Sequence, residues 1–250
     1  MKLARLGDGP EIFHTIQGEG VSAGSPAVFI RTSRCNLHCH WCDTDHTWNF
    51  EGTPWKHAKD ANPDYTKFKK EDVTLEISPQ EAADLILTHN CDRVVITGGE
   101  PLLQQEDCLA LIQAVRLARP ETIFEVETNG TRSPSPALAE AIDQFNISPK
   151  LANSGMDASL RIVPEALQNL SSLAGSWFKF VVTGSKDLAE IEDLLQTHEI
   201  PASKVILMPE GRDSATLDER AGWLAECCRK KGFRLGDRLH VRIWGDERGK

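Results

Sequence analysis

The sequence predicts an α/β protein of 250 residues that folds as a barrel or partial barrel of six βα units. Two observations predict this class. Short apolar, β-branched runs alternate with amphipathic segments of helical length, and unusual polar segments follow the apolar runs. Strands that alternate with helices pair in parallel through right-handed crossovers. A chain of this length can bury one hydrophobic core, so we expect a single domain over residues 1–250.

The strands and helices follow from composition and capping signals. The first clear strand, 27–32 (AVFIRT), is apolar and β-branched, and 93–97 (RVVIT) has the same character. Ser78, Pro79 and Glu81 form a typical helix start with a capping box. The predicted strands are 27–32, 93–97, 122–127, 145–148, 177–182 and 204–208. The predicted helices are 79–89, 105–118, 134–144, 164–173, 185–197 and 214–231, the last of these being the final helix.

Polar segments occur where the predicted strands end. These segments are RTSRC, TGGEP, EVETNG, ISPK and LMPEGR. In a parallel barrel, chemistry gathers at the C-terminal ends of the strands, so we expect the functional site there. Spacing alone does not exclude a doubly wound open sheet.

Composition and charge exclude several classes of function. The chain has no apolar run long enough to cross a bilayer and begins without the apolar core of a signal peptide, so we expect a cytoplasmic protein and no membrane partner. A net charge of −9 argues against nucleic acid as a partner, because phosphate binding needs clustered Lys and Arg. The substrate is therefore expected to be a small molecule.

The segment 48–76 is polar, rich in Lys, Asp and Pro, and shows little periodicity. We interpret it as an insertion. It either covers the site or is simply solvated, and the solvated loop is the favoured interpretation.

Three of the seven cysteines lie within eight residues, which is typical of a metal-binding cluster rather than of disulfides. The other four, Cys91, Cys108, Cys227 and Cys228, are expected to be buried small hydrophobes. Cys35, Cys39 and Cys42 supply thiolates for three irons of a cubane and leave the fourth iron open. A zinc site completed by His38, His40 or His46 is the alternative. Both His38 and His40 are expected to be exposed, and Trp41 either shields a bound adenine or packs the loop.

Cys-x-x-x-Cys-x-aromatic-Cys after a first strand resembles the radical S-adenosylmethionine superfamily. The resemblance implies a partial (βα)6 TIM-like barrel of the radical SAM type and a 4Fe-4S cluster whose open iron binds the methionine part of S-adenosylmethionine. It also implies that one electron from the cluster cleaves the cofactor to a 5′-deoxyadenosyl radical. The protein then orients the reactants and excludes solvent.

Other strand ends fit the same resemblance. Gly98, Gly99 and Glu100 are similar to the superfamily's GGE motif, although a plain turn would also explain them. Glu127, Ser148 and Lys150 lie where ribose hydroxyls and the methionine carboxylate are held in that superfamily. Each of these residues would otherwise be a capped strand end.

TIQGEG at 15–20, Arg31, CDT at 42–44, TGGEP, ETNG, ISPK and the terminal LHVRIWGDERGK together resemble the 7-carboxy-7-deazaguanine synthase family. The resemblance covers residues 11–250 except the insertion. It implies a radical SAM carbon–nitrogen lyase of 7-deazapurine (preQ0/queuosine) biosynthesis. Such an enzyme converts 6-carboxy-5,6,7,8-tetrahydropterin to 7-carboxy-7-deazaguanine with loss of ammonia and requires magnesium.

The family resemblance also implies roles for individual residues. The implied substrate contacts are Ile16, Gln17, Gly18, Glu19, Arg31, Thr97 and His240, the last within a C-terminal segment, 232–250, that closes the substrate site. Amide, carboxylate and backbone groups suit a pterin edge, and a guanidinium fork suits its carboxylate. Thr44 matches the magnesium ligand.

For S-adenosylmethionine the implied contacts are Trp41, Cys42, Asp43, Gly99, Glu127, Ser148, Pro149, Lys150, Leu207, Met208, Pro209 and Glu210. The sequence departs from the family at LMPEGR, which lacks a Gln-Pro pair found in many members. Adenine recognition by residues 207–210 is therefore the least supported of these assignments.

Two other functions share part of the pattern. A glycyl-radical enzyme activase has the cysteine loop and the GGE motif, but TIQGEG, Arg31 and His240 argue against it. A non-enzymatic iron–sulfur electron carrier would leave the GGE and ISPK strand ends without a role. The family resemblance further implies a homodimer and a flavodoxin-like reductant, neither of which follows from the residues themselves.

Overall fold

The protein forms one sheet of eleven strands, and the computed structural model describes all 250 residues. The strands are β1 (Lys2–Leu6), β2 (Gly9–Pro10), β3 (Ile12–Ile16), β4 (Pro26–Thr32), β5 (Thr74–Glu76), β6 (Arg93–Gly98), β7 (Ile123–Thr128), β8 (Gln144–Ile147), β9 (Ser176–Val182), β10 (Val205–Pro209) and β11 (Arg234–Leu235). Their order is β11-β10-β9-β8-β7-β6-β4-β1-β2, with β3 on β4 and β5 on β1.

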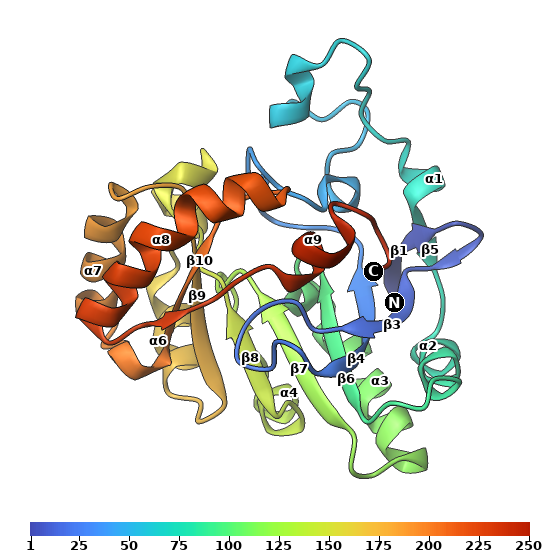
Figure 1. Ribbon diagram of the computed structural model, residues 1–250. Coiled ribbons are helices and arrows are strands. Elements are labelled where there is room, and N and C mark those ends of the chain that lie inside the picture. The colour runs from blue at the N-terminus through green and yellow to red at the C-terminus, as the bar shows by residue number, and fades with distance from the viewer.

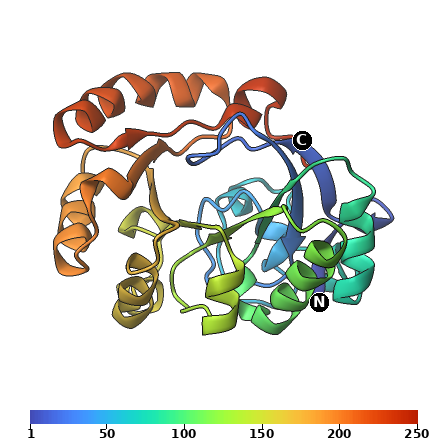
Figure 2. The ribbon, with the colours of Figure 1, turned by 90° about the horizontal axis from the view of Figure 1, so that it is seen from below.

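The six predicted strands are confirmed as β4 and β6 to β10. They pair in parallel in the order of the chain, so strand order never reverses as it would in a doubly wound sheet. The sheet curves strongly and its two edges do not pair, which makes it a partial barrel (Figure 2). The predicted partial (βα)6 barrel is therefore confirmed.

Most of the helices cover the outside of this curved sheet (Figure 1). They are α1 (Lys70–Val73), α2 (Pro79–Leu87), α3 (Gln105–Ala118), α4 (Pro136–Ala141), α5 (Ala158–Arg161), α6 (Pro164–Ser171), α7 (Asp187–Thr197), α8 (Ser214–Lys231) and α9 (Leu239–Trp244). At the start of α2, Ser78 Oγ accepts from the backbone N–H of Glu81, and the Glu81 carboxylate accepts from the Ser78 N–H at 2.7 Å. The predicted capping box is present.

The main core lies between the sheet and the helices. Alternate strand residues such as Ile30, Ile96 and Phe180 face the helices and are fully buried. Each large apolar side chain buried in this way contributes roughly 1.5–3 kcal/mol. The residues between them, such as Arg31 and Thr97, are paired across β4 and β6 and face the barrel interior. Period-two alternation thus separates a packing face from a functional face.

The interior below the site is closed by a polar cluster around Glu125 on β7. This fully buried carboxylate accepts hydrogen bonds from Ser22 Oγ at 2.8 Å and Asn146 Nδ2 at 3.0 Å, and it pairs with Arg93. Gln144 Nε2 donates a further bond at 3.1 Å. A buried charge with this many partners is satisfied. The cluster thereby ties the loop after β3 to β6, β7 and β8.

Three features differ from the sequence predictions. Strand 27–32 is not the first, since β1, β2 and β3 precede it, and β3 includes Thr15 and Ile16 of TIQGEG. The end of the segment 48–76 is regular: α1 leads into β5, which pairs antiparallel with β1. Helix α8 is followed by α9.

Among the individual residues outside the core, His38 is half-buried rather than exposed and stacks on Trp55 at 3.8 Å between ring centroids. Cys227 is half-buried rather than buried. Cys91, Cys108 and Cys228 are buried as predicted.

The C-terminal segment crosses the open side of the barrel. After β11 the N–H of Leu239 donates to the carbonyl of Gly18 at 3.0 Å, and α9 follows beside β3 (Figure 1). A Cβ added at Gly18 would overlap the His240 ring, so glycine permits this close approach. Arg248 then donates to the carbonyl of Arg5 at 2.8 Å, so the two chain ends lie close together.

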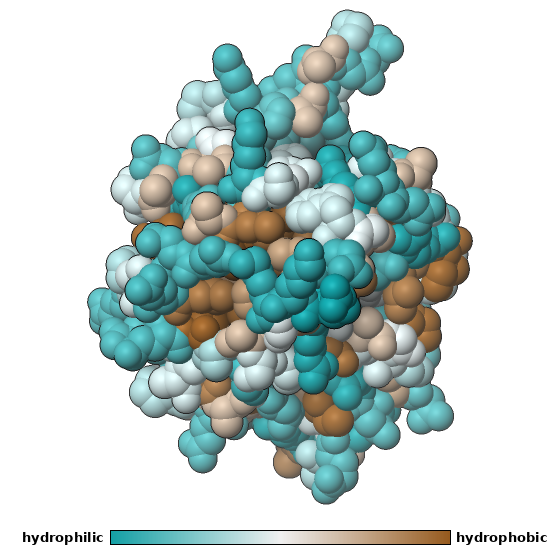
Figure 3. Space-filling model, turned by 60° about the vertical axis from the view of Figure 1, so that its left-hand side comes forward, coloured by the Kyte–Doolittle hydropathy of each residue, from teal (hydrophilic) through white to brown (hydrophobic).

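The molecular surface is mostly hydrophilic, and apolar side chains are recessed between hydrophilic ones on the face shown in Figure 3. None of the helices is both long enough and apolar enough to span a bilayer.

Candidate active site

A cavity opens at the C-terminal ends of the parallel strands, where the sequence predicts the site. Thirty residues line it. The predicted site residues in its wall are Ile16, Gln17, Gly18, Glu19, Arg31, Cys35, Cys39, Trp41, Cys42, Asp43, Thr44, Thr97, Gly99, Glu127, Ser148, Lys150, Met208, Glu210 and His240. Pro149, Leu207 and Pro209 are not in the wall, and Leu207 packs in the main core.

The cysteine loop, residues 33–44, follows β4 directly and is held by the GGE segment. The N–H of Gly99 donates to the Thr32 carbonyl at 3.0 Å, and the N–H of Glu100 donates to the Arg34 carbonyl at 2.9 Å. A Cβ added at Gly99 would overlap the backbone of Arg34. The glycine is therefore required by the close approach of two backbones.

Glu100 of the GGE segment points away from the cavity. Its carboxylate is fully buried and accepts from the N–H of Asn129 at 2.7 Å, the N–H of Leu102 at 3.0 Å and Thr128 Oγ1 at 2.8 Å. It therefore ties the end of β6 to the end of β7, and any ligand contact in this motif comes from the glycines.

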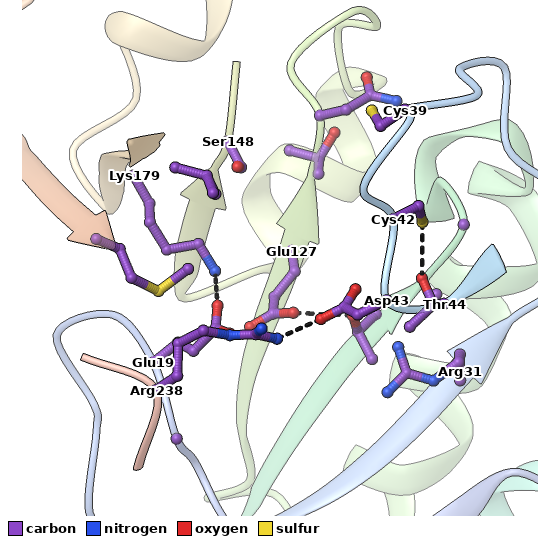
Figure 4. A pocket seen from close by; sticks show the side chains of 18 of the residues that line it. Glu19, Arg31, Cys39, Cys42, Asp43, Thr44, Glu127, Ser148, Lys179 and Arg238 are labelled. Carbon is purple, nitrogen blue, oxygen red and sulfur yellow. Dashed lines mark hydrogen bonds and ion pairs between the residues drawn. The ribbon is translucent and has the colours of Figure 1, made fainter. Parts of the chain in front are cut away.

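The three clustered cysteines line the cavity and pack around Leu37 and Met156; Cys39 and Cys42 are visible in Figure 4. No group of three or more His, Cys, Asp or Glu side chains is close enough to hold a single metal ion. Burial raises the pKa of Cys39 to about 12 and also raises the pKa values of Cys35 and Cys42. Buried thiols of this kind become ligands only when a bound cation stabilises their thiolates.

Arg31 presents an unpaired guanidinium fork to the cavity. Its Nε donates to Glu11 Oε1 at 2.7 Å, while its two terminal nitrogens make no hydrogen bond or ion pair within the protein. Glu11 is itself buried and is also paired with His46 and Arg248. Burial alone would raise the pKa of Glu11, but Arg31 and these neighbours hold that pKa well below its usual range. Glu11 therefore fixes the orientation of the Arg31 side chain.

The opposite wall contains a saturated charge network. Glu19 pairs with Lys179 of β9 and with Arg238 Nε at 3.0 Å, and Arg238 also pairs with Asp43 (Figure 4). Arg238 Nη1 donates to the carbonyl of Gly211 at 2.7 Å. Burial raises the pKa of Glu19, but Lys179 and Arg238 outweigh it and hold that pKa well below its usual range.

His240 lies at the edge of this network. Its Nε2 is 3.9 Å from Glu19 Oε1 and 3.4 Å from Arg238 Nη2. Burial lowers the pKa of His240, although Glu19 opposes that shift. The side chain is thus held neutral against the cavity wall.

Between the two walls, Glu127 at the end of β7 lies in the cavity floor. It accepts from Thr97 Oγ1 at 2.9 Å and from Gln17 Nε2 at 3.4 Å. Gln17 Oε1 in turn accepts from the N–H of Glu19 at 3.1 Å. These residues form a continuous strip of donors and acceptors suited to the edge of a heterocycle.

A third group surrounds the cysteine end of the cavity. Lys150 Nζ donates to Ser148 Oγ at 2.9 Å and lies 5.7 Å from the Trp41 ring centroid. The Trp41 indole N–H donates to the Asn153 carbonyl at 2.9 Å, which fixes the ring. Thr44 Oγ1 is 3.5 Å from Cys42 Sγ. A cation and a hydroxyl beside the cysteines provide the donors that an amino-acid carboxylate needs.

The chain resembles known proteins over nearly its whole length. Residues 16–171 match the family model described as a 4Fe-4S single cluster domain. The 7-carboxy-7-deazaguanine synthase of Pyrobaculum aerophilum is 33% identical over 96% of both chains, and that of Halobacterium salinarum is 37% identical over 96% of this chain and 93% of its own. The crystal structure of QueE from Escherichia coli superposes with a TM-score of 0.65 at 26% identity, covering 92% of both chains.

This chain belongs to the 7-carboxy-7-deazaguanine synthase family. The predicted radical SAM lyase activity in the queuosine pathway, the 4Fe-4S cluster and the S-adenosylmethionine cofactor are confirmed by these relatives. The activase and electron-carrier alternatives are thereby set aside.

Sequence reasoning missed several residues of this synthase-family site. Lys179, Arg238 and Glu11 hold the walls, and Phe13 stacks on Phe29 at 5.5 Å in the cavity lining. One signal was available for Lys179, because a Lys within the apolar run WFKFVV is seldom buried unless it is paired. Arg238 gives no local signal, since its partner Glu19 lies 219 residues away.

Proposed function

We propose that the cavity binds 6-carboxy-5,6,7,8-tetrahydropterin with its carboxylate on Arg31 and converts it to 7-carboxy-7-deazaguanine with loss of ammonia. The observation that carries this assignment is the unpaired fork of Arg31, which faces the cavity while Glu11 holds its Nε. Two parallel donors match a carboxylate bidentately. Glu127, Thr97 and Gln17 then lie along the wall available to the pterin ring.

The cysteine end of the cavity fits a 4Fe-4S cluster and S-adenosylmethionine. Cys35, Cys39 and Cys42 would hold three irons, and the donor set supports this because all three thiols line one cavity, Cys39 being buried and Cys35 and Cys42 half-buried. When bound, the cluster and cofactor supply one-electron chemistry that generates the substrate radical. Lys150 and Ser148 would hold the methionine carboxylate, and Trp41 would cover the cofactor.

The two walls of the cavity hold the substrate in one orientation and shield it from water. Arg238 fastens the C-terminal segment 232–250 to Glu19 and Asp43, so this segment closes the substrate side of a single domain. His240, neutral beside Glu19, is placed to accept or donate a hydrogen bond at the pterin edge.

Magnesium is proposed to bind at Thr44. The hydroxyl faces the cavity and has only the Cys42 sulfur within hydrogen-bond range, so an oxygen-seeking cation can use it. No carboxylate cluster surrounds Thr44. The remaining ligands would therefore be substrate oxygens and water, which is usual for Mg²⁺.

The cellular setting is proposed from the family resemblance alone. We propose a cytoplasmic homodimer that receives electrons from a flavodoxin-like protein. Size measurement in solution and reduction by purified flavodoxin test these two statements separately.

The function is tested by anaerobic incubation of reconstituted protein with 6-carboxytetrahydropterin, S-adenosylmethionine, reductant and magnesium. Mass spectrometry should detect 7-carboxy-7-deazaguanine and ammonia should accumulate with it. Cofactor cleavage without a deazapurine product would exclude the synthase assignment. A cluster without cofactor cleavage would indicate an electron carrier.

A further inference from the structure

Trp48 carries a buried hydrogen-bond donor without an acceptor. Its side chain is 5% exposed and lines the cavity together with Cys42. The indole Nε1 is buried and has no hydrogen-bond partner anywhere in the chain. Buried polar groups are almost always paired, and an unpaired one costs about 1–3 kcal/mol. A missing partner is therefore expected at this position.

The neighbouring rings do not supply that partner. His38 and His57 lie 6.2 and 6.0 Å from Trp48 between ring centroids, in tilted and edge-on arrangements. His57 Nε2 is instead 2.8 Å from the Cys42 carbonyl oxygen. Trp41 differs from Trp48, because its indole N–H is paired with the Asn153 carbonyl.

The beginning of the segment 48–76 is fixed against the cysteine loop, so Trp48 is not free to turn away. His57 holds the carbonyl of Cys42, and the N–H of Ala58 donates to the carbonyl of His40 at 2.8 Å. Trp55 stacks on His38. The buried side chains of Trp48 and His57 thus pack this part of the segment against the cysteine loop, while most of residues 51–66 are exposed, as expected for a solvated loop.

Trp48 lies beside Cys42 in the cavity wall. Its ring is 6.0 Å from that of His57 between centroids, and His57 Nε2 is 2.8 Å from the Cys42 carbonyl oxygen. Cys42 is therefore the cysteine whose sulfur is available to the unpaired indole N–H. In the thiol form, Cys42 is a weak acceptor, whereas an iron-bound thiolate is a stronger one.

We propose that the Trp48 indole N–H donates a hydrogen bond to the Cys42 thiolate when the 4Fe-4S cluster is bound, and that this bond raises the reduction potential of the cluster. The inference rests on the proposed cluster ligation by Cys42. Reduction adds negative charge to the cluster and its thiolates, so a donor stabilises the reduced form more than the oxidised form. Trp48 is therefore a positioning and tuning residue for electron entry.

The direct test replaces Trp48 with Phe, which keeps an aromatic ring and removes the N–H. The matched control is Trp55→Phe, which alters the same segment without touching a cysteine. Reconstituted proteins are titrated with dithionite and mediators, without pterin or S-adenosylmethionine, and the reduced cluster is followed by EPR. We expect Trp48→Phe to shift the ratio of reduced to oxidised cluster by about tenfold toward the oxidised form, equivalent to about 59 mV lower for a one-electron couple.

An unchanged midpoint potential in Trp48→Phe at full iron and sulfide content would overturn the proposal, as would an equal shift in Trp55→Phe. If Trp48→Phe does not retain the cluster, the bond is tested instead in wild-type protein labelled with ¹⁵N in its indoles, by measuring the ¹⁵N coupling to the reduced cluster. A ¹⁵N coupling to the reduced cluster that persists in Trp41→Phe supports the bond, and its absence from the wild type refutes it. Loss of the cluster signal from wild-type protein would instead contradict the proposed function.

Discussion

Arg31 and Arg238 lie on opposite walls of one cavity and differ in how completely their donors are used. Arg31 makes a single ion pair, through Nε, and its fork is unpaired. Arg238 contacts Glu19, Asp43, the Gly211 carbonyl and His240, so each of its three nitrogens already has a partner within the protein. Both arginines are largely buried.

The difference indicates which charged residues bind and which only hold the wall. A buried guanidinium with spare donors costs free energy until a ligand completes it, whereas a saturated one stabilises the fold by itself. By this criterion we propose Arg31, Glu127 and the three cysteines as ligand-binding groups. Arg238, Lys179 and Glu11 are proposed as positioning groups.

The largest effect is expected when one of the three clustered cysteines is replaced. Cys39→Ala should abolish the 4Fe-4S cluster and all cleavage of S-adenosylmethionine, because Cys39 lines the cavity as one of three thiolate ligands. Cys35→Ala and Cys42→Ala should behave in the same way. Iron and sulfide analysis with visible absorption measures the loss.

Cys108→Ala is the control, since Cys108 is buried in α3 and faces the Pro101 carbonyl. It should retain the cluster. Full iron, sulfide and activity in Cys39→Ala would contradict the assignment of the cluster ligands.

Arg238→Ala should lower the free energy of unfolding by about 3–5 kcal/mol, the usual loss when one partner of a buried ion pair is removed. Asp43 would lose its only ion-pair partner, and Glu19 would retain Lys179. Urea unfolding of the protein without cofactors measures the change. The exposed pair Arg229–Glu226 provides the control, because Arg229→Ala should change stability by less than about 1 kcal/mol.

The same variant should alter the pH dependence of stability. The pKa of Glu19 is depressed in the folded state, so its pairing stabilises the fold fully above the ordinary Glu pKa of about 4.3 and is lost as pH falls below it. Arg238→Ala should therefore flatten the loss of stability that occurs as the pH falls below about 4.3. A loss as steep as in the wild type would show that Glu19 is not stabilised by Arg238.

Arg31→Ala should weaken pterin binding roughly ten- to over a hundred-fold, because a bidentate charge-assisted pair contributes on the order of 1.5–3 kcal/mol. Its effect on folding should be smaller than that of Arg238→Ala, since Glu11 keeps His46 and Arg248. The apparent pterin affinity and the uncoupled 5′-deoxyadenosine are measured side by side. Cofactor cleavage without substrate should persist.

Arg31→Lys provides the matched variant and should recover only part of the affinity, because an ammonium cannot reproduce the fork. Wild-type pterin affinity in Arg31→Ala would remove Arg31 from the substrate site.

The smallest expected effect concerns Thr44. Thr44→Val should reduce magnesium activation of turnover by about two- to tenfold, the range for losing one hydroxyl ligand, and should leave cluster assembly intact. Thr88→Val, at the exposed end of α2, is the control. Magnesium titrations of product formation measure the effect, and an unchanged activation by magnesium in Thr44→Val would exclude this site.

The central strands could be predicted because parallel strands covered by helices have short apolar sequences, as in β4 and β6. Strands β1 and β3 escaped prediction for the opposite reason. They lie outside the parallel series, pair antiparallel, and mix charged or polar residues with apolar ones, as in KLARL and IFHTI. Their partners, rather than their own composition, make them strands.

Site residues could be predicted where several lie within one short segment. The spacing of Cys35, Cys39 and Cys42 alone indicates a metal-binding cluster. Glu11 and Lys179 were not found because their partners are remote in sequence: Lys179 is 160 residues from Glu19. Residues 207–210 were predicted as one group of cofactor contacts, but successive strand residues face opposite sides of the sheet. Met208 therefore lines the cavity, whereas Leu207 packs in the core.

The closure of the cavity by Arg238 has a consequence for biosynthesis of the chain. Arg238 leaves the ribosome 219 residues after Glu19, and Arg248 leaves it 237 residues after Glu11. Until then, the nascent barrel carries buried acidic groups that lack these partners. The contacts that Arg238 and Arg248 make in the cavity wall therefore form only after every strand of the barrel has been synthesised.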